Sequence, residues 1–497
     1  MTADRDALYR SAVLAVAMQW GMRAIGLVSV VVLARLLHPH DFGVVAVAMS
    51  AAAFVELFGW IGLRQALLRI PDPERAHYDT AWTIQFVLFM ALAAAMIAIA
   101  PVAADFYRQP AVTGILCVLS LRMVALAVAN IGIVDFERDL TLERDVAVRL
   151  GARVAALFVT LTAAVLLRDY RALVIGMVAQ STFWTAGTYL AHPYRPRFGL
   201  SRRSEILGMS LWMFVCTFAE WVQGQIERIM LGRVASSTAT GLYSVSRDLS
   251  NIFTQEIATA LNRVTFPVFA QGGSGNRAGL ATLLGAYAMI VAPLGAGLVA
   301  TAPDTIAVLL GAKWLPAAPL MRIIALYTSI QAISLMAAAV LQASGQARRS
   351  AMLNIAGAGL SVLGIGAAAL TYREPVAVAL AATTVSGVVM IASVVALAAC
   401  GRVGAGRLFA ALLRPVIAAG AMAFTLLRVV RVETGSPFLD LVVAVPTGAA
   451  TYAVALAALW TVAGRPPGAE REAAGLIRRI GGGRLGGYAR RVGAALR

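Results

Sequence analysis

Apolar runs of about 20 residues recur along the whole chain, and short gaps that contain arginine or lysine separate them. A helix needs about 20 mostly apolar residues to cross the hydrocarbon core of a bilayer. We therefore expect spans near residues 11–34, 43–63, 80–104, 113–134, 150–167, 171–190, 206–231, 240–262, 279–301, 317–342, 350–370, 375–399, 407–427 and 439–463. The pattern predicts an all-α polytopic membrane protein with about 14 transmembrane helices.

The composition excludes an ordinary soluble domain. Of the 497 residues, 60% are apolar and only 13% are charged, whereas soluble chains are about half apolar and a quarter charged. The formal net charge of +17 would suggest nucleic acid in a soluble protein. Here most of the cations lie in the gaps between apolar runs, so we expect membrane lipids and no nucleic acid as partners.

The distribution of cations predicts the topology. Arginine and lysine favour the cytoplasmic side of short loops. With a cytoplasmic N-terminus, about 26 cations fall in inside segments and about 9 in outside segments. Both termini are therefore expected in the cytoplasm. The Gly- and Arg-rich tail at 464–497 includes an expected short amphipathic helix around Ala469–Ile480.

The chain resembles itself at a spacing of about 200 residues. Leu33–Gly43 reads LARLLHPHDFG and Leu231–Gly241 reads LGRVASSTATG, so in both a helix ends in Leu-x-Arg and a glycine opens the next helix. Proline and alanine also precede a span at Pro110 and at Pro316. These matches predict two six-helix lobes, 1–200 and 201–400, related by a pseudo-two-fold axis along the membrane normal. Two accessory helices at 401–463 would follow them.

Charged and amide side chains occur inside several predicted spans, where an ionisable group costs at least about 2.5–3.5 kcal/mol. The set is Gln19, Arg23, Glu56, Arg122, Glu220, Gln223, Glu227, Arg228, Arg247, Asp248 and Asn251. We expect the four arginines to bind an anionic group, since guanidinium donors match phosphate oxygens. The other members would line a polar cavity or carry a coupling ion. A structural alternative is that pairs such as Arg23–Glu56 or Arg228–Glu227 only hold helices together.

Motifs of cofactor and metal chemistry do not appear in the sequence. There is no Walker A sequence, and the four histidines lie in predicted loops without metal-ligand spacing. The three cysteines lie inside apolar runs and form no disulfide framework. We therefore expect no metal and no cofactor, and transport that relies on an ion or substrate gradient.

Several ordered segments resemble polysaccharide and lipopolysaccharide exporters of the multidrug/oligosaccharidyl-lipid/polysaccharide superfamily. They are Leu33–Gly43, Glu227–Arg233 with the following Gly241-Leu-Tyr-Ser, Arg247, Phe266-Pro-Val-Phe, Lys313–Leu320 and Leu341–Gln346. The resemblance covers about residues 10–400. One departure is Glu227-Arg228, which stands where an Asp-Asn pair is common in that family; it keeps the acid but adds a positive charge.

The resemblance implies two V-shaped six-helix lobes in the bacterial inner membrane. It implies alternating-access flipping of undecaprenyl-pyrophosphate-linked oligosaccharides from the cytoplasmic to the periplasmic leaflet, for surface polysaccharide or exopolysaccharide biosynthesis. Arg23, Arg122, Arg228 and Arg247 would hold the pyrophosphate, and a polysaccharide polymerase and chain-length or export machinery would be partners. The alternatives are a multidrug/cation antiporter or a lipid II flippase of the same superfamily. A membrane-embedded polymerase or ligase would need a larger outside loop, so we do not expect an enzyme.

Overall fold

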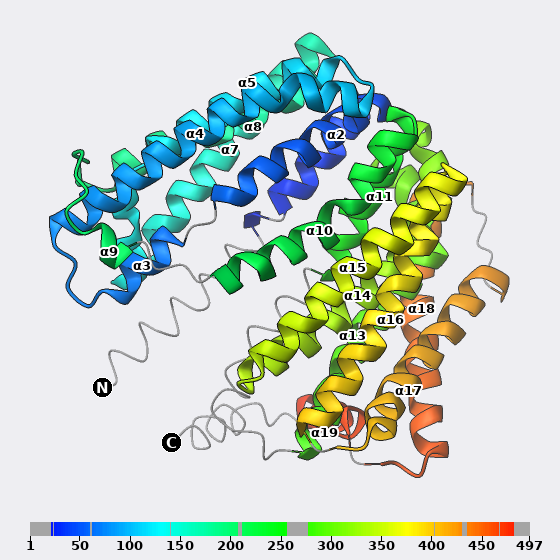
Figure 1. Cartoon of the computed structure of the whole chain (residues 1–497). Helices are drawn as coiled ribbons and strands as arrows, with labels where there is room; N and C mark the ends of the chain where they lie inside the picture. The colour runs from blue at the N-terminus through cyan, green and yellow to red at the C-terminus, as the bar shows by residue number, and fades with distance from the viewer. Residues whose placement is uncertain are drawn as a thin grey trace. The chain divides into compact units, whose positions relative to one another are not determined.

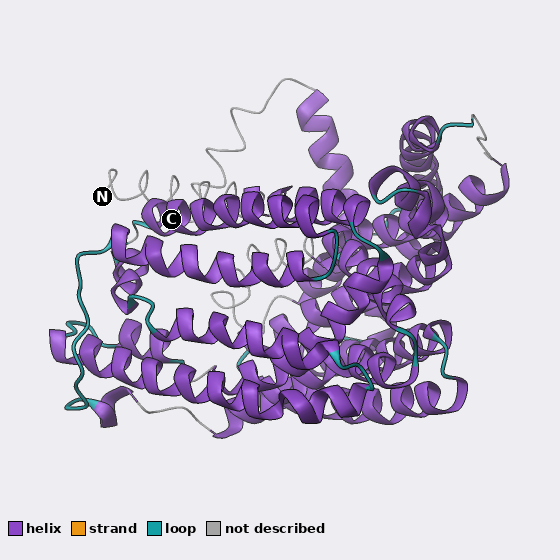
Figure 2. Cartoon of the chain, turned by 90° about the horizontal axis from the view of Figure 1, so that it is seen from above, coloured by secondary structure: helices purple, strands orange, loops and turns teal. Residues whose placement is uncertain are grey.

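The computed structural model describes residues 21–22, 24–59, 62–139, 141–206, 211–255, 277–401, 403–429, 435–466 and 468–481. Gln19 and Arg23 lie outside them. Helices and short loops make up the described chain, which contains no strand (Figures 1 and 2). The helices are α2 (Pro39–Glu56), α3 (Leu63–Arg69), α4 (Arg75–Tyr107), α5 (Ala111–Ala127), α6 (Asp135–Arg138), α7 (Leu142–Leu167), α8 (Arg171–Ala191), α9 (Arg203–Ile206), α10 (Leu211–Val234), α11 (Ser237–Phe253), α13 (Arg277–Leu309), α14 (Ala318–Ala343), α15 (Ala347–Tyr372), α16 (Pro375–Gly401), α17 (Ala405–Phe424), α18 (Pro437–Val462) and α19 (Ala469–Gly481).

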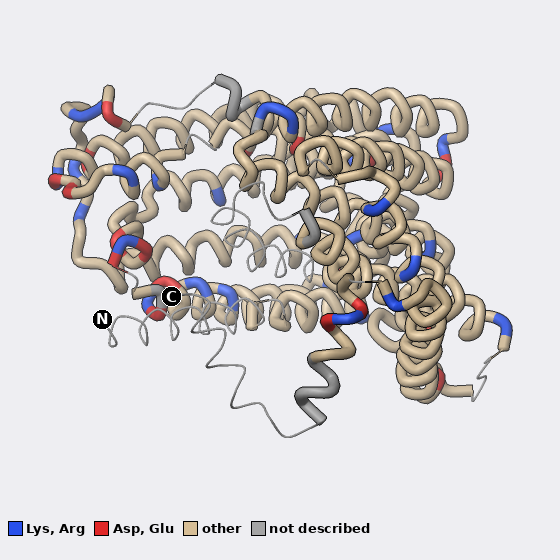
Figure 3. The backbone as a smooth tube through the Cα atoms, turned by 90° about the horizontal axis from the view of Figure 1, so that it is seen from below, with Lys and Arg blue, Asp and Glu red and all other residues tan. Residues whose placement is uncertain are grey.

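Within the described residues, 9 helices are long and apolar enough to cross a membrane, or up to 10 if one bent pair counts as a span. A shorter apolar helix covers Ala24–Leu36. Charged residues gather at helix ends and in loops, and long stretches of helix carry none (Figure 3). The chain is thus an all-α multi-pass membrane protein, as predicted, while the count of fourteen spans stays a prediction.

The expected span at 113–134 is not one straight helix. α5 ends at Ala127, and the next helical segment, Ile131–Arg138, is bent from it by 70°. Side chains of neighbouring helices satisfy the carbonyls at this break: Gln85 donates to those of residues 126 and 129, Thr185 to that of 125, and Tyr189 to that of 128. The bend is therefore stable because carbonyls that lose their helical partners gain side-chain donors.

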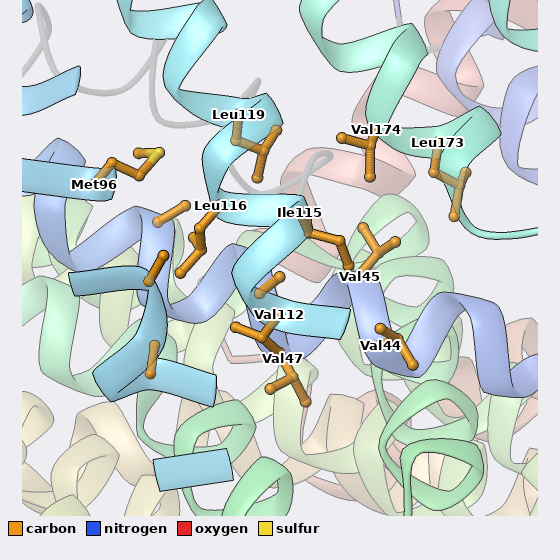
Figure 4. Packing of buried hydrophobic residues seen from close by; sticks show 14 of the residues in the cluster. Val44, Val45, Val47, Met96, Val112, Ile115, Leu116, Leu119, Leu173 and Val174 are labelled. Atoms are coloured by element: carbon orange, nitrogen blue, oxygen red, sulfur yellow. The ribbon is translucent and has the colours of Figure 1, made fainter. Parts of the chain in front are cut away.

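The described chain divides into two compact units. Unit 1 comprises Met1–Val245, Leu309–Pro316 and Ala358–Val378, and unit 2 comprises Ser246–Val308, Ala317–Gly357 and Ala379–Arg497. The main core of unit 1 joins α2, α4, α5 and α8, with valine and leucine side chains of α2 and α5 interleaved (Figure 4). The main core of unit 2 joins α13, α14, α16 and α17. The predicted lobe boundaries at residues 200 and 400 remain predictions.

A short helix, α19, lies beyond the last apolar helix of unit 2. It confirms the amphipathic helix expected around Ala469–Ile480, and its first residues pack on the bundle. Glu470 is almost fully buried and forms an ion pair with Arg414 of α17, with 3.2 Å between Nε and Oε1. A Cβ added at Gly285 of α13 would touch the methyl group of Ala469 at 3.5 Å. α19 is thereby fixed to α13 and α17.

Candidate functional site

The polar side chains of the predicted spans fall into separate groups in the structure. In unit 1, Glu56 at the end of α2 accepts a hydrogen bond from Arg122 of α5, with 2.5 Å between Oε1 and Nη1. Arg122 lies about 17 Å along α5 from its first residue and about 8 Å before the helix ends at Ala127, so the pair is in the second half of this apolar helix. The side chain of Glu56 is 25% exposed and that of Arg122 is 28% exposed. A guanidinium that is paired yet partly open can bind an anion without first losing its own carboxylate partner.

Aromatic rings of α2 and α10 meet where these two helices approach each other in unit 1. The ring centroids of Phe54 and Trp221 are 5.4 Å apart, and Phe218 stacks on Trp221 at 5.9 Å. Glu220 is adjacent to Trp221 in the chain and is exposed. Apolar rings beside a carboxylate form a surface that accepts an amphipathic or cationic molecule.

The polar side chains of α10 differ in burial along the helix. Glu220 is exposed and Gln223 is partly buried, but Glu227 is fully buried. The hydroxyl of Tyr243 on α11, itself fully buried, donates to Oε2 of Glu227 at 2.6 Å. Glu227 therefore faces α11 and not an open space, while its neighbour Arg228 is partly buried.

In unit 2, Arg247 of α11 is 6% exposed and packs against Tyr327 of α14. Its guanidinium carbon lies 5.8 Å from the ring centroid, and Nη2 donates to the tyrosine hydroxyl at 3.4 Å. Asp248 is exposed and Asn251 is partly buried on the same helix. A buried arginine on an aromatic face is held in position by cation–π attraction and packing.

The structure thus joins Glu56 with Arg122 and gives Glu227 and Arg247 aromatic hydroxyl partners. Among the described residues these three pairs belong to different helix contacts: α2 with α5, α10 with α11, and α11 with α14. The predicted roles of the four arginines and of the remaining polar residues stay predictions, including those of Gln19 and Arg23, which lie outside the described residues.

A contact that polarity could not indicate is the close crossing of α2 and α11 in unit 1. A Cβ on Gly43 would overlap the carbonyl oxygen of Ser237, and a Cβ on Gly241 would overlap that of Pro39. Each added Cβ would also lie 2.9 Å from the amide nitrogen of the other glycine. Gly43 and Gly241 hold the same position in the two segments of the internal repeat, as do Pro39 and Ser237. Two helices related by a two-fold axis produce such reciprocal contacts.

Two aromatic residues of unit 1, Trp314 and Tyr107, contact equivalent positions of the two repeat segments near this crossing. Trp314 donates its indole N–H to the carbonyl of Ala34 at 2.8 Å. Gly232 occupies the position in the second segment of the repeat that Ala34 occupies in the first. A Cβ added to Gly232 would lie 3.0 Å from the ring of Tyr107. Lys313 adds hydrogen bonds to the carbonyls of residues 35 and 37. The Leu-x-Arg and Pro-Ala matches of the repeat were the only sequence signals for these contacts.

Comparison with known proteins agrees with this helical arrangement. A family profile described as "Polysaccharide biosynthesis protein" matches residues 32–319. The chain belongs to this family. The resemblance inferred from the sequence motifs is therefore confirmed.

Named relatives carry related descriptions. The succinoglycan biosynthesis transport protein ExoT of Rhizobium meliloti (strain 1021) is 25% identical over 313 residues, which cover 61% of this chain and 62% of that protein. The lipopolysaccharide biosynthesis protein WzxC of Escherichia coli (strain K12) is 20% identical over 338 residues, covering 67% and 69%. The match thus spans about three-fifths of ExoT and little more of WzxC.

Two solved structures share the fold. The lipid II flippase MurJ in an inward closed conformation superposes with a TM-score of 0.75 and 11% identity, over 90% of this chain and 99% of that chain. An inward-facing multidrug resistance MATE family transporter gives a TM-score of 0.56 and 14% identity, over 77% and 96%. At such identities the likeness establishes the fold alone.

Proposed function

We propose that this protein flips lipid-linked oligosaccharides, carried on undecaprenyl pyrophosphate, from the cytoplasmic to the periplasmic leaflet of a bacterial inner membrane. Family membership, the transport name of ExoT and the fold shared with a lipid flippase support this function. The observation that carries it is the Glu56–Arg122 pair, which places a partly open guanidinium on the apolar helix α5. The product would serve surface polysaccharide or exopolysaccharide biosynthesis, with a polymerase and chain-length or export machinery as partners.

The physical step that the protein has to assist is the passage of a charged pyrophosphate through hydrocarbon. Burying an unpaired anion is prohibitive, so a flippase must offer donors inside the bilayer. Arg122 offers such donors, and Glu56 keeps the guanidinium compensated while no substrate is bound. Arg23, Arg228 and Arg247 are proposed as further contacts, and Glu220 and Asp248 as exposed acids for a coupling ion.

The direct test is a deletion strain complemented by single variants. Loss of the gene should abolish the surface polymer and cause lipid-linked repeats to accumulate in the cytoplasmic leaflet. Arg122→Gln should reduce export at least tenfold, because it removes the charge that meets the pyrophosphate, whereas Arg373→Gln, an exposed arginine between α15 and α16, should leave export unchanged. Full export by the Arg122→Gln variant would refute its substrate role, and a deletion without polymer loss or repeat accumulation would refute the flippase.

The proposed topology places both termini in the cytoplasm. Fusions of a reporter that is active only in the periplasm should be silent at either terminus and active after Arg373, between α15 and α16. Activity at either terminus would overturn this orientation.

A second candidate is a multidrug/cation antiporter of the same superfamily. The exposed Glu220 beside the Phe218–Trp221 stack favours it, since acids with aromatic rings bind organic cations. Drug-efflux assays with a lipophilic cation separate the two functions: efflux that depends on Glu220, with normal surface polymer in the deletion strain, would favour the antiporter.

A further inference from the structure

The segment His192–Arg202, here called the strap, joins α8 to α9 without regular structure and runs along the first turns of α4. It is the loop that precedes α9 at the left of Figure 1. The backbone N–H of Arg197 donates to Asp79 at 3.1 Å, and the N–H of Gly199 donates to the hydroxyl of Thr83 at 3.0 Å. Since Asp79 and Thr83 are one turn apart on α4, the strap follows that helix.

The start of the strap is fixed equally firmly. The side-chain amide of Asn130, at the bend after α5, donates to the carbonyls of His192 at 3.3 Å and Tyr194 at 2.8 Å. The hydroxyl of Tyr194 donates to Asp79 at 2.6 Å. The strap therefore has a defined position on the helices, and its outward side chains are displayed at fixed places.

Two large apolar side chains of the strap are directed outward. Phe198 is 69% exposed and Leu200 is 51% exposed. The inner edge of Phe198 contacts Trp82 and Phe86 of α4, with ring centroids 5.2 and 5.4 Å away. These two rings lie roughly 10 and 16 Å along α4 from its first residue. Phe198 is thus held at the level where α4 enters the predicted hydrocarbon region.

Arginines lie near Phe198 and Leu200 in the chain, and they differ in whether other protein groups bind their guanidinium groups. Arg195 donates to the carbonyls of residues 189, 192 and 194 at the end of α8, so its guanidinium completes that helix terminus. Arg202 pairs with Glu74 and Glu205. Arg197, next to Phe198, has an exposed side chain. The strap therefore displays the exposed side chain of Arg197 together with two exposed apolar side chains at the predicted membrane boundary.

We propose that the strap is a binding site for an anionic phospholipid of the cytoplasmic leaflet. Arg197 contacts the headgroup phosphate, and Phe198 and Leu200 lie among the first methylenes of the acyl chains. Arginine extends its charged group to this interfacial depth, and a basic residue near an anionic leaflet adds about 1 kcal/mol of attraction. A lipid is favoured over a soluble protein because Phe198 rests on a membrane helix at hydrocarbon level, where acyl chains are the surrounding molecules.

The test is native mass spectrometry of the full chain in detergent, titrated with phosphatidylglycerol or with phosphatidylcholine. Arg197→Gln should weaken phosphatidylglycerol binding about fivefold, which corresponds to about 1 kcal/mol, and Arg197→Lys should restore most of it. Phe198→Ser should weaken both lipids, because it removes the acyl-chain contact. The matched controls are Phe158→Ser on α7, equally exposed at 67%, and Arg373→Gln.

Unchanged phosphatidylglycerol binding by Arg197→Gln, or equal losses for the Arg373→Gln control, would overturn the assignment. The assignment would also be overturned if the Arg197→Gln and Phe198→Ser variants bound lipid normally but lost export activity in cells. This result would indicate that the strap binds a protein partner. Melting temperatures of the variants distinguish a lost site from a lost fold, and the outcome is independent of which substrate the protein transports.

Discussion

Replacement of Gly43 by alanine is the sharpest test of the crossing between α2 and α11. The added methyl carbon would overlap the carbonyl of Ser237 and lie 2.9 Å from the amide nitrogen of Gly241. Both obstacles are backbone atoms, so the helices themselves must separate, and overpacking of this kind costs about 1–3 kcal/mol. We expect a loss near the upper end, about 3 kcal/mol, offset by the roughly 0.5–1 kcal/mol that alanine gains over glycine in a helix. The net loss should be about 2 kcal/mol.

A matched control exists in α5, where a Cβ on Gly114 would meet no atom within 4 Å. Gly114→Ala should therefore show only the gain in helix propensity. The free energy of unfolding can be measured in mixed micelles by titration with a denaturing detergent. Gly241→Ala should cost about as much as Gly43→Ala, and the double variant should cost less than the sum, since helices already separated accommodate the second methyl. Equal stabilities of Gly43→Ala and Gly114→Ala would refute the close approach.

Three further outcomes can be measured on the same preparation. Tyr243→Phe should destabilise the protein by about 1.5–3 kcal/mol, because it removes a hydroxyl donor from the buried Glu227 carboxyl group. Trp314→Phe should cost about 1 kcal/mol by removing the indole hydrogen bond to the carbonyl of Ala34, and an unchanged unfolding midpoint would contradict that bond. Burial lowers the pKa of His192 despite the opposing effect of a neighbouring carboxylate. The unfolded state therefore binds more protons near pH 6, so stability should fall on acidification through this region, and His192→Gln should flatten that part of the pH profile.

The helices were largely predictable from sequence because the bilayer imposes length and apolarity on each one. The expected spans at 279–301 and 350–370 fall inside observed helices, Arg277–Leu309 and Ala347–Tyr372, and the expected span at 439–463 ends one residue beyond the helix Pro437–Val462. Hydropathy alone could not locate the bend after Ala127, because the donors that stabilise it come from α4 and α8. Side chains distant in the chain decided where that helix ends.

The candidate site was predictable in its residue types and less so in its pairings. A buried charge needs a partner, and Glu56 has one in Arg122 of α5, a pairing that the sequence did not indicate. The alternative partner considered from the sequence, Arg23, lies outside the described residues. Similarly, Glu227 lies two turns from the exposed Glu220 on α10, but it is buried and accepts a hydrogen bond from Tyr243. Periodicity identifies the face of a helix, but only the packing of other helices determines which of its residues become inaccessible to solvent.

The attachment of α19 has a practical consequence for engineering the C-terminus. A chain cut directly after α18 would lose Glu470 and leave Arg414 poorly solvated, with no carboxylate to balance its charge. Purification tags and fluorescent reporters therefore belong after Gly481, and a shortened version that ends at Val462 should be obtained in lower yield even though every apolar helix is retained.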